Sequence, residues 1–221
     1  MALNKNSKIK VVKIESSVPK TINDKYLLYL PDKYHQINKN RPFIFFLHGA
    51  GERGKNIELV KKHGPLKLIA QNKNLPFIIA APQCIENMRW NIEELNILLD
   101  KIISKYNIDT KRIYLTGLSM GGFGTWEMAI KFPNKFAAII PVCGGGDPIK
   151  VCKIKDLPIW VFHGAKDNIV PLSKSEEIVT ALKECGGNPK FTIYPDAEHD
   201  SWTETYNNPQ IYEWLLQFRK K

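Results

Sequence analysis

A serine, an aspartate and a histidine in the C-terminal half of the chain have the residue types and the order that nucleophilic catalysis needs. Ser119 lies at the centre of a G-x-S-x-G pentapeptide, and Asp167 and His199 follow it. An alcohol is a poor nucleophile near neutral pH, so a serine that attacks a carbonyl needs a base. Histidine can take the proton and later return it, while a carboxylate on its other ring nitrogen fixes the tautomer. The three residues together predict acyl transfer through a serine ester.

The segment around Ser119 predicts a strand, a sharp turn and a helix. Residues 113–116 form a short apolar run, and residues 123–130 carry apolar side chains at helical spacing before a proline. A serine on such a turn is expected to have a positive φ, which brings Gly117 and Gly121 too close together for side chains. This is the context in which G-x-S-x-G forms a nucleophile elbow. The alternative is a glycine-rich turn that carries an idle serine.

Asp167 is the preferred carboxylate because it comes directly after the strand expected at residues 159–162. Five other acids compete for this role: Asp147, Asp156, Asp196, Glu198 and Asp200. Three of them stand beside His199 in its own loop and cannot readily reach its far ring nitrogen. Asp147 lies on the glycine loop after an earlier strand. The order serine, aspartate, histidine is that of the α/β-hydrolase triad.

His199 is the expected base because it lies in the loop 195–200 that follows the last strand. His48 and His163 both stand in His-Gly pairs at strand ends, where their rings are expected to support the loops. His35 and His63 lie in polar loops without a motif and are expected at the solvated surface.

Two backbone N–H groups are expected to bind the oxyanion of a tetrahedral intermediate. One belongs to Met120, directly after the nucleophile, and the other is assigned to Ala50 in the turn 48–51, with Gly51 as the reserve. Such a donor contributes about 3 kcal/mol in other enzymes. The alternatives for this turn are simple loop geometry or a phosphate cradle. A cradle is disfavoured because the chain contains no P-loop or dinucleotide-binding pattern.

Short apolar segments alternate with amphipathic ones along the whole chain, which predicts a doubly wound α/β fold with a mostly parallel sheet. Strands are expected at residues 8–15, 25–30, 43–47, 77–81, 112–116, 136–142, 159–162 and 190–194. Helices are expected after the elbow and at residues 91–106, 173–185 and 206–218. Ser173 is the expected N-cap of its helix, Pro82 is expected to end a strand, and a loop is expected after Gly64-Pro65. Residues 1–221 are read as one domain without a large cap, which predicts an open site.

The composition limits the classes of partner. The net charge is +10, but the lysines are spread along the chain rather than gathered into a basic stripe, so nucleic acid is not an expected partner. No apolar run has the length of a transmembrane helix, and the N-terminal segment lacks the apolar region of a signal peptide. The sequence as given predicts a cytoplasmic protein, with secretion after removal of a signal as the alternative. The oligomeric state is left open.

The four cysteines do not have the spacing of a metal site. Cys143 and Cys152 are close enough in the sequence to consider a disulfide, but a domain of this size does not require one, and free or buried thiols are expected. The expected chemistry needs only water, so neither a metal nor an organic cofactor is predicted.

With these residues in place, the chain resembles the small bacterial serine esterases of the α/β-hydrolase class. The resemblance covers about residues 25–218 and is carried by HGAGERG, APQC followed by Trp90, RIYLTGLSMGGFGTWEMAIKFPNKFAAIIPVCGGGD, FHGAKDNIVP and EHDSW. The group includes the phospholipase/carboxylesterase, dienelactone-hydrolase-like and poly(hydroxybutyrate)-depolymerase or feruloyl-esterase-like branches, often labelled "predicted peptidase". The chain departs from dienelactone hydrolase proper, whose nucleophile is cysteine, and from true lipases, which carry a large lid.

The resemblance implies roles for further residues. It implies that Trp90 and Trp202 border the acyl pocket, with core or loop-anchoring tryptophans as the alternative, and Gly51 is placed with them at the substrate. Glu52 and Arg53 are expected to orient the oxyanion turn by pairing with each other or with the scaffold.

Three functions remain open from the sequence. The first is a carboxylic-ester hydrolase for short acyl or aryl esters, including acetyl or feruloyl groups on plant polysaccharide. The second is a peptidase of the prolyl-oligopeptidase kind, which the lack of a propeller or other gating domain disfavours. The third is a non-catalytic binding module, which an unbroken triad disfavours.

Overall fold

The computed structural model describes residues 8–14, 21–36 and 40–220, and these ranges contain one eight-stranded sheet. The strands are β1 (Ile9–Lys13), β2 (Ile22–Tyr29), β3 (Arg41–Leu47), β4 (Ile78–Cys84), β5 (Ile108–Leu118), β6 (Ala138–Val142), β7 (Trp160–Gly164) and β8 (Lys190–Tyr194). Their order across the sheet is β1-β2-β4-β3-β5-β6-β7-β8. Strands β1 and β2 run antiparallel to their neighbours, and β3 to β8 are parallel. The predicted α/β-hydrolase architecture is confirmed.

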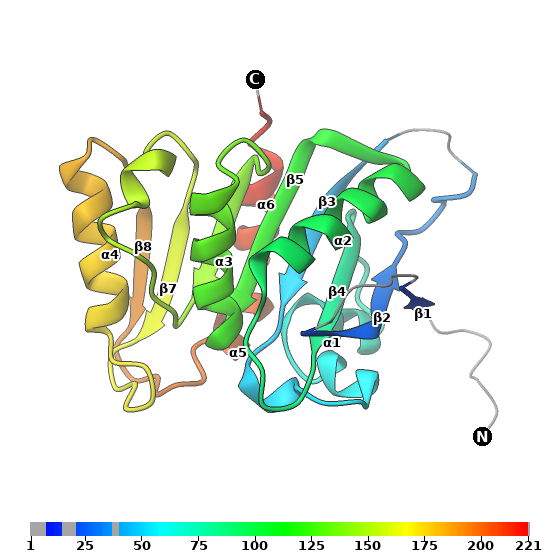
Figure 1. Ribbon diagram of the computed structural model, residues 1–221, viewed down its shortest axis with the longest axis horizontal. Helices are drawn as coiled ribbons and strands as arrows, with labels where there is room; N and C mark the ends of the chain where they lie inside the picture. Colours follow the sequence, from blue (N-terminus) through cyan, green and yellow to red (C-terminus); the bar gives the residue numbers. More distant parts are fainter. Residues whose placement is uncertain (1–7, 15–20, 37–39, 221) are drawn as a thin grey trace.

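Both faces of the sheet are covered, as an all-parallel core requires. Helices α2 (Ile92–Lys105), α3 (Met120–Lys131) and α4 (Ser173–Glu184) contribute to the core on one face. Helices α1 (Gly64–Ala70), α5 (Trp202–Asn207) and α6 (Gln210–Leu216) cover the other face (Figure 1). The side chains of strand β3 alternate between the two faces. Phe43 and Phe45 pack on the face covered by α2, α3 and α4, and Ile44 and Phe46 pack on the face covered by α1, α5 and α6. An uninterrupted apolar run is what a strand buried on both faces needs.

Helix α2 illustrates how the sequence fixes an element. Asn91 caps the helix by accepting hydrogen bonds from the N–H groups of Glu93 and Glu94, whose acidic side chains suit the first turn. The side chains on its inner face are buried at helical spacing: Ile92, Leu95, Leu98, Leu99 and Ile102. This apolar stripe packs on the sheet and holds the helix in place.

Several expected element boundaries are wrong, and strands β2 and β5 begin earlier than expected, at Ile22 and Ile108. Helix α1 occupies a stretch expected to be a loop, and proline at its first turn is compatible with a helix. Strand β4 continues through Pro82 to Cys84. Its pairing with β3 ends at Ala80, so the N–H that Pro82 lacks is not needed for a hydrogen bond to β3. The closing helix is two helices, α5 and α6, separated at Pro209. The N-cap of α4 is Leu172, not Ser173.

The cysteine prediction is correct for one pair and wrong for the other. Cys84 and Cys143 are free and buried. Cys152 and Cys185 instead form a disulfide between the short 3₁₀ helix η3 (Val151–Ile154) and the C-terminal end of α4. Their α-carbons are 5.5 Å apart, a normal spacing for a disulfide, although 33 residues separate them in the sequence. The fold brings them together, so local spacing could not reveal the pair. Within the described ranges, no helix is long and apolar enough to cross a bilayer.

Candidate active site

Ser119 stands on a sharp turn between the end of β5 and the start of α3. Its φ is +51°, as predicted for a serine at an elbow. A Cβ on Gly117 would run into the backbone of Gly121, and a Cβ on Gly121 would run into the carbonyl oxygen of Leu47 at the end of β3. Both positions therefore require glycine, and the turn fits tightly against the neighbouring strand.

The loops after β7 and β8 are bonded to each other, which brings Asp167 and His199 together. The N–H of Ala165 donates to the carbonyl of Tyr194, and the N–H of Lys166 donates to the carbonyl of Ala197. Gly164 makes this approach possible, because a Cβ there would collide with the backbone of the second loop. The register of β7 and β8 thus sets the positions of both side chains.

Ser119, His199 and Asp167 form one chain of hydrogen bonds. The Nδ1 atom of His199 lies 2.7 Å from Oδ2 of Asp167, and its Nε2 atom lies 2.9 Å from Oγ of Ser119. A carboxylate can only accept, so the ring proton is on Nδ1 and Nε2 is free to accept from the serine hydroxyl. This arrangement fits a serine nucleophile, a histidine base and an orienting acid.

Asp167 is held as a carboxylate. Burial alone would raise its pKa, but hydrogen bonds from His199 and from the N–H groups of Val170 and Ile169 outweigh burial and lower the pKa. Of the competing acids, Asp196 pairs with Lys166, Asp147 pairs with Lys150, and Asp200 accepts hydrogen bonds from Thr203. None of these three bonds to His199 in the structure.

The turn after β3 lies directly against the elbow. It forms a short 3₁₀ helix, η1 (Ala50–Glu52), and Gly49 before it packs on Leu118 at the end of β5. The N–H groups of Ala50 and Met120 are the first of their helices, and neither donates to an acceptor among the residues that the structure describes. Free N–H groups at the two helix starts are what the predicted oxyanion-binding role requires.

His48 supports this turn from the interior of the protein. It is fully buried, and its Nε2 atom accepts a hydrogen bond from the N–H of Cys84, while its Nδ1 atom donates to the carbonyl of Gly49. Burial lowers the pKa of His48 to about 4; the bond to Gly49 opposes this shift, and Arg53 adds to it. His48 is therefore a neutral support of the loop, as predicted.

Trp90 is almost completely buried. Its side chain is 7% exposed and belongs to the core, where its indole N–H donates to the carbonyl of His48. These contacts favour the loop-anchoring alternative, and a role as pocket wall stays a prediction. Gly51, by contrast, is exposed, and a Cβ at this position would meet no described atom within 4 Å. Its place beside a substrate stays a prediction.

Trp202 is half-buried and lies beside His199, with the two rings 5.1 Å apart and perpendicular. Its indole N–H donates to Nδ1 of His63. His63 is therefore not the solvated surface residue that the sequence suggested, since its side chain is only 27% exposed and its Nε2 faces Glu52. No motif surrounds His63, so no local signal could reveal this contact.

Glu52 and Arg53 bond to the scaffold rather than to each other. Glu52 is buried and accepts a hydrogen bond from the N–H of Gly49. Burial raises the pKa of Glu52, while His63 and the Gly49 N–H oppose the shift. Arg53 donates to the carbonyls of Ala50 and Met88. Both side chains thus hold the turn that presents the Ala50 N–H.

Among the described residues, ligand atoms of Cys143, Asp167 and His199 lie within 4.8 Å of one another, as the ligands of a metal site would. Burial raises the pKa of the Cys143 thiol to about 12, so the sulfur stays protonated and is a poor ligand. The facing atoms of Asp167 and His199 already bond to each other. The geometry favours a hydrogen-bonded chain over a metal centre.

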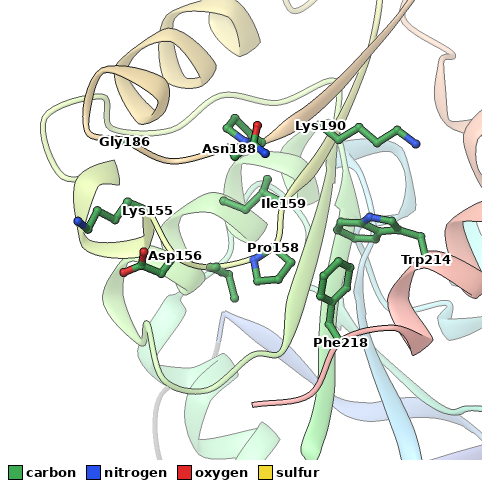
Figure 2. Close-up of a pocket in the computed structure, with 11 residues that line it drawn as sticks. Lys155, Asp156, Pro158, Ile159, Gly186, Asn188, Lys190, Trp214 and Phe218 are labelled. Carbon is green, nitrogen blue, oxygen red and sulfur yellow. The ribbon is translucent and has the colours of Figure 1, made fainter. Parts of the chain in front are cut away.

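A separate cavity of about 640 Å³ lies where β7 and β8 begin, at the edge of the sheet opposite to Ser119. Figure 2 shows the rings of Trp214 and Phe218 across from Lys155 and Asp156. The residues that line it include no serine, cysteine or histidine, so the cavity lacks the hydroxyl or thiol nucleophile and the histidine base of a catalytic triad. The candidate active site is the surface around Ser119.

Comparison with known proteins assigns the chain to a family. Residues 80–210 match the phospholipase/carboxylesterase family, and the chain belongs to that family of α/β-hydrolase esterases. The matched stretch contains Ser119, Asp167 and His199.

Individual relatives are more distant. A bifunctional acetylxylan esterase/xylanase from Neocallimastix patriciarum is 27% identical over 187 residues, which cover 79% of this chain but 26% of that protein. The crystal structure of a thermostable esterase is 34% identical with a TM-score of 0.81, covering 96% of this chain and 63% of that one. A feruloyl esterase module from Clostridium thermocellum, complexed with sinapinate, has a TM-score of 0.69 at 20% identity, with 96% and 89% covered. At that identity the last similarity establishes the fold alone.

Proposed function

We propose that the protein is a serine carboxylesterase that works through an acyl-enzyme on Ser119. The observation that carries this proposal is the unbroken chain of hydrogen bonds from Ser119 through His199 to Asp167. We assign Ser119 as nucleophile, His199 as general base and acid, and Asp167 as the carboxylate that orients the ring.

Acylation begins when Oγ of Ser119 bonds to the ester carbonyl carbon and the carbonyl electron pair moves to its oxygen. The serine proton passes to Nε2 of His199, and Asp167 stabilises the imidazolium that results. The N–H groups of Met120 and Ala50 bind the oxyanion. Collapse breaks the bond to the alcohol oxygen, which takes the proton from His199 and leaves.

Deacylation repeats these steps with water. His199 takes a proton from the water molecule while its oxygen bonds to the acyl carbon. The second tetrahedral intermediate then collapses, the bond to Oγ of Ser119 breaks, and the serine regains a proton from His199. The carboxylic acid is released, and the enzyme returns to its starting state.

For the substrate, we propose short acyl or aryl esters, with acetyl or feruloyl groups on plant polysaccharide as the natural case. Three features support this. The stretch between β6 and β7 contains only loops and η3, so no cap covers Ser119 from that side. The relative from Neocallimastix patriciarum, whose match covers 79% of this chain, is named for acetylxylan esterase activity. Trp202 beside His199 offers an aromatic wall to the ester.

The test is hydrolysis of p-nitrophenyl esters from acetate to octanoate, together with methyl ferulate, by the wild type and Ser119→Ala. We expect the highest kcat/KM on acetate or ferulate and the loss of turnover in the variant, with an unchanged circular dichroism spectrum. Full activity in Ser119→Ala would refute the serine mechanism. A rate that rises toward octanoate would refute the short-acyl assignment. Matched peptide amides in the same panel would detect a peptidase.

A further inference from the structure

Trp202 lies between two histidines that come from different parts of the chain. On one side its ring meets His199 at a right angle, with the ring centres 5.1 Å apart. On the other side its indole nitrogen lies 3.2 Å from Nδ1 of His63, and these two rings are also edge to face. The tryptophan thus joins the loop after β8 to the segment that precedes α1.

The indole N–H of Trp202 determines which ring nitrogen of His63 carries the proton. An indole N–H can only donate, so Nδ1 of His63 must carry a lone pair and the proton of the neutral ring is on Nε2. That Nε2 atom faces a carboxylate, Oε1 of Glu52, at 3.7 Å. His63 therefore accepts on the side of Trp202 and presents its N–H to Glu52.

Glu52 carries the connection to the turn that presents Ala50. Its other carboxylate oxygen, Oε2, accepts from the N–H of Gly49 at 3.0 Å, and Glu52 itself is the last residue of η1. Lys62 beside His63 contributes positive charge near this carboxylate. One histidine thus contacts both the ring packed on His199 and the side chain that holds the oxyanion turn.

We propose that His63 is a positioning residue for the esterase reaction. It accepts the indole N–H of Trp202 and so fixes the ring against which His199 packs. Asp167 and Ser119 hold the two ring nitrogens of His199, but these two bonds still allow the imidazole plane to tilt. The edge-to-face contact with Trp202 restricts this tilt. This inference rests on the proposed role of His199 as the catalytic base.

The first test is a double-mutant cycle with p-nitrophenyl acetate. His63→Phe keeps a ring but removes the acceptor, and Trp202→Phe keeps a ring but removes the donor. We expect His63→Phe to lower kcat about fivefold, the value of one hydrogen bond, with little change in KM. In the Trp202→Phe background the same substitution should have almost no effect, because the bond is already absent.

Two further variants separate positioning from a general structural role. His63→Asn places Oδ1 where Nδ1 stands and can accept from the indole, so it should recover most of the lost kcat. His35→Phe makes the same change at an exposed histidine and should leave kcat and KM at the wild-type values. Additive effects in the cycle, or no recovery with asparagine, would overturn the proposal.

The second test does not depend on turnover. The indole ¹H–¹⁵N resonance of Trp202 is identified by its loss in Trp202→Phe. It should move upfield in His63→Phe, return in His63→Asn and stay in place in His35→Phe. An unmoved resonance in His63→Phe would overturn the contact. A moved resonance with unchanged kcat would overturn the positioning role, while the serine mechanism would still be judged by Ser119→Ala alone.

Discussion

The molecule contains the same tripeptide, His-Gly-Ala, at the ends of two parallel strands, at residues 48–50 after β3 and 163–165 at the end of β7. Both histidines are fully buried. Both glycines lie where a Cβ would collide with the neighbouring element. By sequence the two turns look interchangeable, yet one presents a backbone N–H beside the elbow and the other leads to the carboxylate that holds His199.

The difference lies in the backbone groups around each ring. Nε2 of His48 receives the N–H of Cys84, so it must be an acceptor. Nε2 of His163 faces the carbonyl of Val170 at 2.9 Å and Oδ2 of Asp167 at 3.2 Å, so it must be a donor. The two rings therefore need opposite protonation at the same atom. The same tripeptide therefore has a different role in each turn, because different elements pack on it.

The turn at 163–165 should be the more sensitive one, because it leads to Asp167. In Asp167→Asn the amide can still accept from Ile169 and Val170 through Oδ1, but its Nδ2 donates to His199 and forces the ring proton onto Nε2. That tautomer cannot take the proton of Ser119. We expect kcat to fall by about 10⁴.

Steady-state kinetics on p-nitrophenyl acetate measures this effect. Asp156→Asn makes the same substitution at an exposed aspartate in the cavity of Figure 2 and serves as the control. If Asp167→Asn kept more than a tenth of the wild-type kcat, Asp167 would not be the orienting acid.

The turn at 48–50 can be tested by removing one N–H. Gly49 has φ −81° and ψ −176°, a conformation that a following proline permits, and Ala50 is the first residue of η1. Ala50→Pro should therefore fold and lower kcat by about 10²–10³, the effect of losing one oxyanion donor. Ala50→Gly keeps the N–H and should lose far less. Equal rates for the two variants would assign the second donor elsewhere.

The neutral state of His48 predicts how stability depends on pH. Its pKa falls from 6.5 in the unfolded chain to about 4 in the folded protein, so the unfolded state binds more protons between these values. The contribution of His48 to the free energy of unfolding is therefore fully present above pH 6.5. It is lost as the pH falls toward 4, which lowers the free energy of unfolding by about 3 kcal/mol.

Urea unfolding at several pH values measures this decrease. In His48→Gln the titrating group is gone, and the part of the pH dependence between 6.5 and 4 should shrink. His35→Gln, at an exposed position, should leave the curve unchanged. An identical slope in wild type and His48→Gln would contradict a buried neutral ring.

The smallest effect is expected at the opposite edge of the sheet. Trp214→Ala changes the wall of the cavity in Figure 2, which lies at the start of β7 and β8, whereas Ser119, Asp167 and His199 follow strand ends. We expect kcat and KM per folded molecule to stay within about twofold of the wild type, since distant sites act independently. A larger change would show that this edge takes part in turnover.

The parts of the site that depend on short stretches of sequence could be predicted. A strand, a glycine-flanked serine and a helix predict the elbow at Ser119, and strand ends predict where Asp167 and His199 lie. Contacts between distant segments leave no such pattern. His63 meets Trp202 across 139 residues of sequence, and the Cys152–Cys185 disulfide forms only once η3 and α4 are adjacent. The role of Trp90 could not be predicted, because a core anchor and a pocket wall have the same residue type.

The assignment of Ser119 as the nucleophile can be tested without any substrate, by labelling the protein with a fluorophosphonate. Mass spectrometry of the intact protein and of its peptides should find one label per chain, attached to Ser119. Ser119→Ala should take up none, and Asp167→Asn should react more slowly than the wild type. A label on another residue, or equal uptake by Ser119→Ala, would contradict the serine mechanism.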